Sequence, residues 1–165
     1  MKTCYVAALV LAIAVVSCKQ DKRTGDIITK KPVAEVHKTI QKTGDYSQTR
    51  HVNWLGNDYS IIVQRTAETN STVVDEGSGN QYYNNKIVVR ILRKDGTEFF
   101  KREFTKSDFS SYLDNSYNKK GVLLGVVFDR VEGDNMYFAA SVGSPDKLSD
   151  EYIPLVVKVS RTGNA

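Results

Sequence analysis

Cysteine is almost absent from this chain of 165 residues: Cys4 and Cys18 are the only two. From residue 19 onward no thiol is available for disulfides, thiolate metal ligands or nucleophilic catalysis. Histidine is equally scarce, and His37 and His51 have neither HExxH nor paired-ligand spacing, which disfavours transition-metal catalysis. The fold must therefore depend on its hydrophobic core.

Long apolar runs are also absent, with one exception near the amino terminus. Residues 5–17, YVAALVLAIAVVS, form an apolar run of 13 residues that follows the basic Lys2. A transmembrane helix needs about 20 apolar residues, whereas the apolar region of a secretory signal has about 7 to 15. The sequence therefore predicts a signal peptide over residues 1–17.

The end of this run resembles the lipobox of bacterial lipoproteins, because Val15, Val16 and Ser17 directly precede Cys18. The resemblance implies that the Cys18 thiol carries a diacylglyceryl group, that cleavage occurs just before Cys18, and that the new amine is acylated. One acyl chain holds a protein to a membrane only marginally, whereas two or three anchor it durably. The alternative is that Cys18 is incidental and lies beside an ordinary signal cleavage site.

The net charge of +4 is distributed unevenly. Residues 19–50 hold 8 basic and 4 acidic side chains, and residues 51–165 hold 14 basic and 15 acidic ones. The globular part thus lacks the basic excess of a nucleic-acid-binding protein. We predict a lipidated cysteine and basic tether over residues 18–50 and a single globular domain over residues 51–165. The tether either favours an anionic lipid surface or is simply a solvated linker.

Alternating apolar residues predict β-strands through most of residues 51–165. Turns are expected at Gly56-Asn57, at Asp95-Gly96 and at residues 132–135. In the strand before the turn at residues 132–135, the apolar residues Val122, Leu124, Val126 and Phe128 occupy alternate positions. The last strand, residues 152–160, contains Pro154, which predicts an edge position because proline cannot donate a ladder hydrogen bond.

One helix is expected between these hairpins. Thr105 is a candidate N-cap with Asp108 three residues later, and Phe109, Tyr112 and Leu113 form a stripe that would pack on a sheet. The predicted fold class is mainly β: an antiparallel β-sandwich, or a curled sheet or partly open barrel, of six to eight strands with one short helix packed on it.

Several stretches together resemble a family of uncharacterised Bacteroidota lipoproteins that is classed under a domain of unknown function. The stretches are VNWLGNDYSIIVQR (52–65), FTKSDFSSYLD (104–114), VFDRVEGDNMYFAASVGSPD (127–146) and DEYIPLVVKVSR (150–161). The resemblance implies a lipid-anchored, mainly β domain. It carries no established activity, so no catalytic residue is transferred from the family.

The most suggestive polar pattern is a set of tyrosines beside asparagines, in NQYYNN (80–85) and SYLDNSYN (111–118). Exposed tyrosines with amide neighbours stack on sugars or form protein contacts. We therefore select Tyr82, Tyr83, Asn84 and Tyr117 as candidate contacts for a ligand or partner. The alternative is that Tyr112 belongs to the core and that the other tyrosines cover strand ends.

Other polar segments are weaker candidates. GSGN (77–80) lacks the GxSxG elbow and is typical of a hairpin loop, and VDEGSGNQ (74–81) lacks the spacing of an EF-hand calcium loop. Glu98 and Glu103 flank a strand, but a carboxylate pair for glycoside hydrolysis depends on their separation. The sequence thus predicts no catalytic residue, no metal ligand and no cofactor.

The expected function is that of a lipid-anchored cell-envelope protein with a non-catalytic domain that binds an envelope protein or a glycan, and not a nucleic acid. The alternatives are a periplasmic hydrolase that uses carboxylates assembled by the fold, and a structural envelope component. Lys19 and Gln20 follow Cys18 in place of the acidic run that resembles a surface-export signal. This predicts a location on the outer membrane, facing the periplasm.

Overall fold

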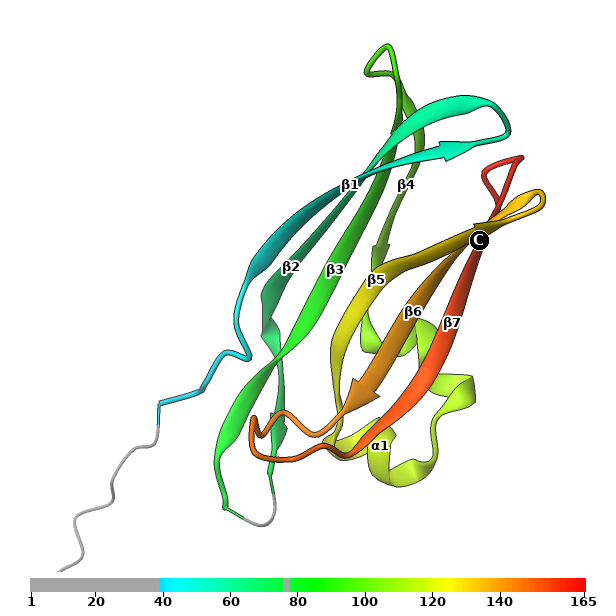
Figure 1. Ribbon diagram of the computed structural model, residues 1–165. Helices are drawn as coiled ribbons and strands as arrows, with labels where there is room; N and C mark the ends of the chain where they lie inside the picture. Colours follow the sequence, from blue (N-terminus) through cyan, green and yellow to red (C-terminus); the bar gives the residue numbers. More distant parts are fainter. Residues whose placement is uncertain (1–38, 76–77) are drawn as a thin grey trace, which may run out of the picture. The chain divides into compact units, whose positions relative to one another are not determined.

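The computed structural model describes residues 39–75 and 78–165, which form two antiparallel β-sheets (Figure 1). The four-stranded sheet contains, in spatial order, β1 (Tyr46–Trp54), β2 (Asn57–Val74), β3 (Gln81–Arg93) and β4 (Glu98–Phe104). The three-stranded sheet contains β5 (Val122–Glu132), β6 (Asn135–Gly143) and β7 (Tyr152–Ser160). The prediction of a mainly β, open sandwich is confirmed, and β1 begins five residues inside the range assigned to the tether.

Short hairpin turns join β1 to β2, β3 to β4 and β5 to β6, as the sequence predicted. The first turn lies one residue earlier than expected, because Trp54 pairs with Asn57 and the two loop residues are Leu55 and Gly56. Both have positive φ, 52° and 75°, as a two-residue type I′ turn requires. Leucine is rare in this conformation, so the sequence favoured a turn at Gly56-Asn57.

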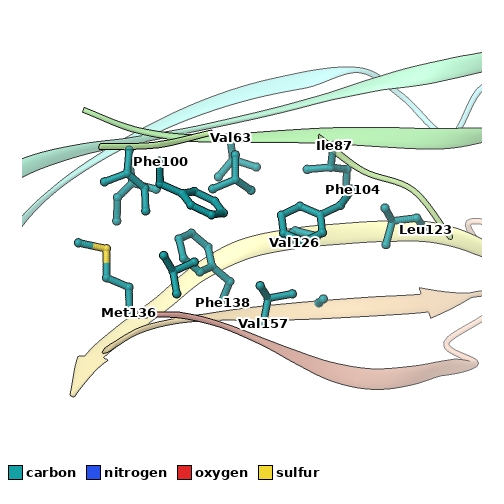
Figure 2. Packing of buried hydrophobic residues seen from close by; sticks show 14 of the residues in the cluster. Val63, Ile87, Phe100, Phe104, Leu123, Val126, Met136, Phe138 and Val157 are labelled. Atoms are coloured by element: carbon teal, nitrogen blue, oxygen red, sulfur yellow. The ribbon is translucent and has the colours of Figure 1, made fainter. Parts of the chain in front are cut away.

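The core lies between the two sheets, where alternate residues of each strand face one another (Figure 2). Val63, Ile87 and Phe100 come from the four-stranded sheet, and Phe138 and Val157 face them from the other. Each of these side chains is buried. Burial of this aliphatic and aromatic surface holds the sheets together without disulfides among the described residues.

The alternation predicted in β5 is wrong at one position. Leu123 is fully buried, whereas Leu124 is only partly buried. The register of β5 against β6 shifts between Leu123 and Gly125, and again between Phe128 and Arg130. A β-bulge adds one residue to a strand and thereby exchanges the faces that the following residues occupy.

Two short helices lie between β4 and β5 instead of the single predicted one. The first, η1 (Lys106–Tyr112), is a 3₁₀ helix with the predicted capping box between Thr105 and Asp108. Its stripe is only partly as expected: Phe109 and Leu113 are buried, but Tyr112 is 72% exposed. Leu113 reaches the core because it leaves the helix in an extended conformation.

The second helix, α1 (Asn115–Lys120), was not predicted. Asp114 caps it by accepting a 2.9 Å hydrogen bond from the Tyr117 N–H. Its six residues are too few to give a periodic apolar pattern. Lys106 ties η1 to this helix by donating to the carbonyl oxygens of Asn118 and Gly121, at 2.8 and 2.9 Å. Burial lowers the pKa of Lys106.

The opposite end of the sandwich is closed by aromatic side chains. Trp54, Tyr59 and Phe99 have ring centroids 5.6 to 5.7 Å apart in tilted and edge-on arrangements. The Trp54 indole N–H also donates a 3.0 Å hydrogen bond to the Gly133 carbonyl oxygen, in the turn between β5 and β6. This contact ties the end of β1 to the other sheet.

Candidate functional site

The structure places the tyrosine and asparagine candidates in different environments. Tyr82 is 7% exposed and Asn84 is 3% exposed, so the expected exposed patch of Tyr82 and Tyr83 does not form. Tyr82 packs with Val73 of the neighbouring strand. The segment before β1 also covers this part of β3, since Gln41 donates to the Gln81 carbonyl oxygen and accepts from the Tyr83 N–H. Tyr83 is partly buried.

The two buried asparagines of β3 have a structural role that the sequence did not reveal. Asn85 Nδ2 donates a 2.7 Å hydrogen bond to the Leu123 carbonyl oxygen, and the Leu123 N–H donates a 3.2 Å bond to Asn84 Oδ1. Asn85 also bonds the Thr43 hydroxyl. Buried backbone groups need such partners, and no strand of residues 39–75 and 78–165 pairs with β5 on this side.

Arg65 of β2 extends the same connection. Its guanidinium donates to the Leu124 carbonyl oxygen of β5 and to the Gly44 carbonyl oxygen, the latter at 2.8 Å. It also lies over the Tyr46 ring, 4.7 Å from the centroid. The polar side chains at this edge therefore join the sheets and the segment before β1, and they are occupied by these internal contacts.

A small polar cleft lies beside α1, and it contains the fourth candidate, Tyr117. The cleft measures about 170 Å³ and is lined by Asp75, Ser116, Tyr117, Lys120, Gly121, Ser144, Pro145 and Glu151. Asp75 and Glu151 thus share one cleft. Its volume is below the range of about 300 to 1,000 Å³ that is typical of small-molecule sites. The Asp75 carboxylate accepts a 3.2 Å hydrogen bond from the Ser78 N–H, as in a hairpin loop.

His51 lies on the outer face of the four-stranded sheet, paired with a serine across the hairpin. Its Nδ1 is 3.0 Å from Ser60 Oγ. The nearby Asp58 carboxylate accepts from Asn53 at 3.0 Å and contacts the Lys94 ammonium at 3.6 Å, and these two partners lower the pKa of Asp58. Among the described residues, His51 therefore lacks the orienting carboxylate of a Ser-His-Asp triad.

The rest of this outer face combines partly buried apolar residues, Ile62, Val88 and Leu92, with cross-strand ion pairs. Glu103 pairs with Lys86 at 3.5 Å, and Glu98 pairs with Arg90 at 3.4 Å. The two glutamates selected from the sequence are thus charge-balanced members of a solvated sheet surface. Exposed pairs of this kind contribute little to stability but keep the face hydrophilic.

The outer face of the three-stranded sheet is different. Across its centre, Val127 of β5, Ala139 of β6 and Val156 of β7 lie directly opposite one another. Val156 is 69% exposed and Val127 is 39% exposed. We call this surface the apolar face; its residues are Gly125, Val127, Tyr137, Ala139, Ser141, Tyr152, Pro154 and Val156.

Basic residues border one end of the apolar face. Arg130 lies over the Tyr137 ring at 4.5 Å, and its charge is balanced by Asp129 and Glu132. Lys158 lies opposite Tyr137 on β7 and forms no ion pair within the part of the chain that the structure describes. This end of the face therefore carries one cation, Lys158, that no carboxylate of the described residues pairs with, beside Arg130 and its two carboxylates.

Residues 39–75 and 78–165 contain neither a candidate metal cluster nor a membrane-spanning helix. No group of three or more His, Cys, Asp or Glu residues in these ranges is arranged to hold a metal ion. The helices in the same ranges are too short and too polar to cross a membrane. Residues 1–38, which include the predicted signal peptide and Cys18, lie outside the described part.

Comparison with known proteins gives one family. The family model described as Domain of unknown function (DUF4738) matches residues 26–165. The match covers both sheets and the two helices, and it begins within the predicted tether. No curated protein matches the chain.

Proposed function

We propose, since this chain belongs to the DUF4738 family of domains of unknown function, that it is a lipid-anchored protein of a bacterial cell envelope whose β-sandwich binds another protein. The apolar face is the proposed contact surface, and Cys18 is the proposed site of lipid attachment. The observation that carries the binding function is the exposed row of Val127, Ala139 and Val156.

The two outer faces of the sandwich support this choice of surface. The solvent-facing side of an antiparallel sheet is normally polar, and the four-stranded sheet follows this rule in that its outward apolar residues, Ile62, Val88 and Leu92, are partly buried beside ion pairs. The three-stranded sheet does not, because Val156 and Val127 stand exposed beside an alanine. A contiguous exposed apolar patch is typical of a protein contact.

The chemistry of the row favours a protein over a glycan as the partner. Sugar recognition depends on hydrogen-bonding groups and on aromatic rings that stack on the sugar. The central row of the face has neither, because Val127, Ala139 and Val156 are aliphatic, and the two tyrosines of the face, Tyr137 and Tyr152, lie toward its opposite ends. Dehydration of aliphatic surface against a similar surface is a main favourable contribution to protein association.

The lipid anchor is supported by the sequence. The apolar run over residues 5–17 has the length of a signal region and ends directly at Cys18. Acyl chains on this residue would hold the domain at a membrane surface and restrict its partners to that surface. Lys19 and Gln20 support the periplasmic side of the outer membrane.

Labelling with a fatty acid in cells tests the anchor. We expect Cys18→Ser to abolish incorporation of labelled palmitate, and Cys4→Ser, the matched control, to retain it. Mass spectrometry of the mature amino terminus identifies the modified residue. Full incorporation into Cys18→Ser would contradict lipid attachment at this residue.

Co-purification from cross-linked envelopes tests the contact surface. Val156→Lys places a charge in the apolar row, whereas Gln64→Lys places the same charge on the outer face of the four-stranded sheet. We expect the first change to reduce recovery of the bound protein at least tenfold and the second to leave it unchanged. Equal recovery with both variants would exclude the apolar face.

One observation favours a second candidate, a hydrolase, because Asp75 and Glu151 line the same cleft. Carboxylate pairs cleave glycosidic bonds when their separation suits an inverting or a retaining mechanism. The hydrolase hypothesis predicts that envelope glycan cleavage is lost in Glu151→Gln and retained in Val156→Lys. The absence of cleavage by the unaltered protein on a panel of such glycans would exclude it.

A further inference from the structure

We propose that the apolar face packs against the same face of a second copy of this chain and forms a weak twofold dimer. This inference rests on the proposed function, because it takes the apolar face as the contact surface and names its partner. It is carried by the distribution of apolar, basic and acidic residues along the three-stranded sheet.

A cation without an ion pair among the described residues and an acidic loop lie at opposite ends of the face. Lys158 lies near one end. At the other end, Tyr152 follows Asp150 and Glu151, in a loop (144–151) that has three acidic residues and one lysine. A surface with an apolar centre, an unpaired lysine near one end and carboxylates near the other is complementary to a copy of itself that is turned end for end.

The twofold axis of such a dimer lies between the two faces, parallel to the sheets and perpendicular to their strands. If the axis passes between the Ala139–Val156 pair and the Ser141–Pro154 pair, each β7 lies over the other in the opposite direction. Val156 of each copy then contacts Pro154 of the other, and Lys158 reaches the other copy's Asp150. The small side chains of Ala139 and Ser141 permit close approach near the axis.

The size of the face predicts the strength of the contact. Strand spacing and rise put the area of its eight residues at about 260 Å² per copy, or about 520 Å² for two copies. Stable interfaces bury about 1,200 to 2,000 Å² in total, so the dimer should be weak in solution. Anchoring both copies in one membrane raises their effective concentration and favours pairing there.

Pairing through the free edge of β7 is less favourable than pairing through its face. The Ser144 N–H donates to the Glu151 carbonyl oxygen at 3.0 Å, and the register of β6 against β7 continues from this pair without a shift. Because ladder bonds alternate in antiparallel pairs, the backbone of residues 154, 156 and 158 points to the free edge. Pro154 supplies no donor there, and proline and lysine on an edge both oppose strand addition.

Cross-linking in vesicles tests the dimer with the full-length lipidated protein. In a Cys4→Ser background, we introduce Ala139→Cys near the axis, or Gln64→Cys as the exposed control on the other sheet. The proteins are reconstituted in vesicles of phosphatidylethanolamine and phosphatidylglycerol and treated with a short bifunctional maleimide. We expect Ala139→Cys to form cross-linked dimers at least tenfold faster than Gln64→Cys, and equal rates would overturn the proposal.

A charge exchange provides the second readout, and it does not depend on the apolar row. Added to Ala139→Cys, Lys158→Glu should slow cross-linking several-fold, and Asp150→Lys in combination should restore it. Failure of the pair to restore the rate would overturn the end-for-end arrangement. If Val156→Lys reduces recovery of a different envelope protein while Ala139→Cys forms no dimers, the proposed function stands and the dimer is wrong. If Val156→Lys changes neither recovery nor cross-linking, both are wrong.

Discussion

Asn85 Nδ2 donates a 2.7 Å hydrogen bond to the Leu123 carbonyl oxygen, so a side chain of β3 satisfies the backbone of β5 in the opposite sheet. Asn84 accepts the Leu123 N–H in the same place. The two amides thus act as a substitute for a neighbouring strand along this part of β5. They hold the three-stranded sheet, and with it the apolar face, in position.

Asn85→Ala tests this connection. The substitution leaves the buried Leu123 carbonyl oxygen without its donor and removes the bond to Thr43, so we expect the free energy of unfolding to fall by about 2 to 4 kcal/mol. Urea unfolding followed by tryptophan fluorescence measures it. Gln64→Ala on an exposed face should change stability by less than about 0.5 kcal/mol. If Asn85→Ala lowers the free energy of unfolding by no more than Gln64→Ala does, the hydrogen bond to Leu123 does not join the sheets.

Two glycines of the three-stranded sheet should respond differently to alanine. A Cβ at Gly143 would lie 2.3 Å from the Glu151 carbonyl oxygen and 2.8 Å from the Tyr152 Cα, whereas one at Gly125 would meet only Ser141 Oγ, at 4.0 Å. We expect Gly143→Ala to lose about 1 to 3 kcal/mol of stability in thermal unfolding. Gly125→Ala should be neutral or stabilising. Equal effects would contradict the close approach of β6 and β7 at Gly143.

Leu55 holds a positive φ of 52° in the first hairpin turn, a conformation that disfavours leucine. Leu55→Asn should therefore stabilise the protein by about 0.5 to 1 kcal/mol, because asparagine tolerates this conformation and suits type I′ turns. Leu148→Asn is the matched control, since Leu148 is exposed and does not have a positive φ. A midpoint of urea unfolding that is unchanged or lower in Leu55→Asn would contradict the turn assignment.

Asp108 in the capping box gives a prediction about acid stability. Its partial burial acts to raise its pKa, but hydrogen bonds from Thr105 and Arg102 outweigh this effect and hold the pKa below its ordinary value. A depressed pKa in the folded state stabilises the protein above the ordinary carboxyl pKa, and this contribution disappears as the pH falls through the folded pKa. Between about pH 5 and pH 2.5, the melting temperature should therefore fall further in the unaltered protein than in Asp108→Asn.

The difference between the unaltered protein and Asp108→Asn does not include the contributions of the other acid-sensitive groups. Asp58 and Asp95 also have lowered pKa values, because each carboxylate accepts hydrogen bonds from a neighbouring side chain, and both titrate equally in the variant. Identical pH profiles for the unaltered protein and Asp108→Asn would show that the capping box does not stabilise the charged carboxylate.

The sequence predicted the strands well because their alternation is local. The turn at Asp95-Gly96, the strands on both sides of it and the edge position of Pro154 are all as expected. Three features escaped prediction for identifiable reasons. The bulge beside Leu123 shifts the faces of β5, Leu55 adopts a conformation that leucine seldom occupies, and α1 is too short for a periodic pattern.

The candidate contact residues were harder to predict, because their environment depends on distant segments. Tyr82 and Asn84 are covered by the segment before β1 and by β5, which no local pattern indicates. The apolar face had a signal that was overlooked. Val127, Ala139 and Val156 occupy the outward positions of strands whose inward positions are already apolar, and this is unusual for a sheet exposed to water.

The most direct test of the account is a photoreactive amino acid placed on the apolar face of the lipidated protein in intact cells. We introduce p-benzoyl-phenylalanine at position 156, and at position 64 as the control on the other outer face. After illumination, the account predicts a discrete cross-linked protein, either a second copy of the chain or another envelope protein, from position 156 and little from position 64. Cross-linking that is equal at both positions, or confined to position 64, would contradict it.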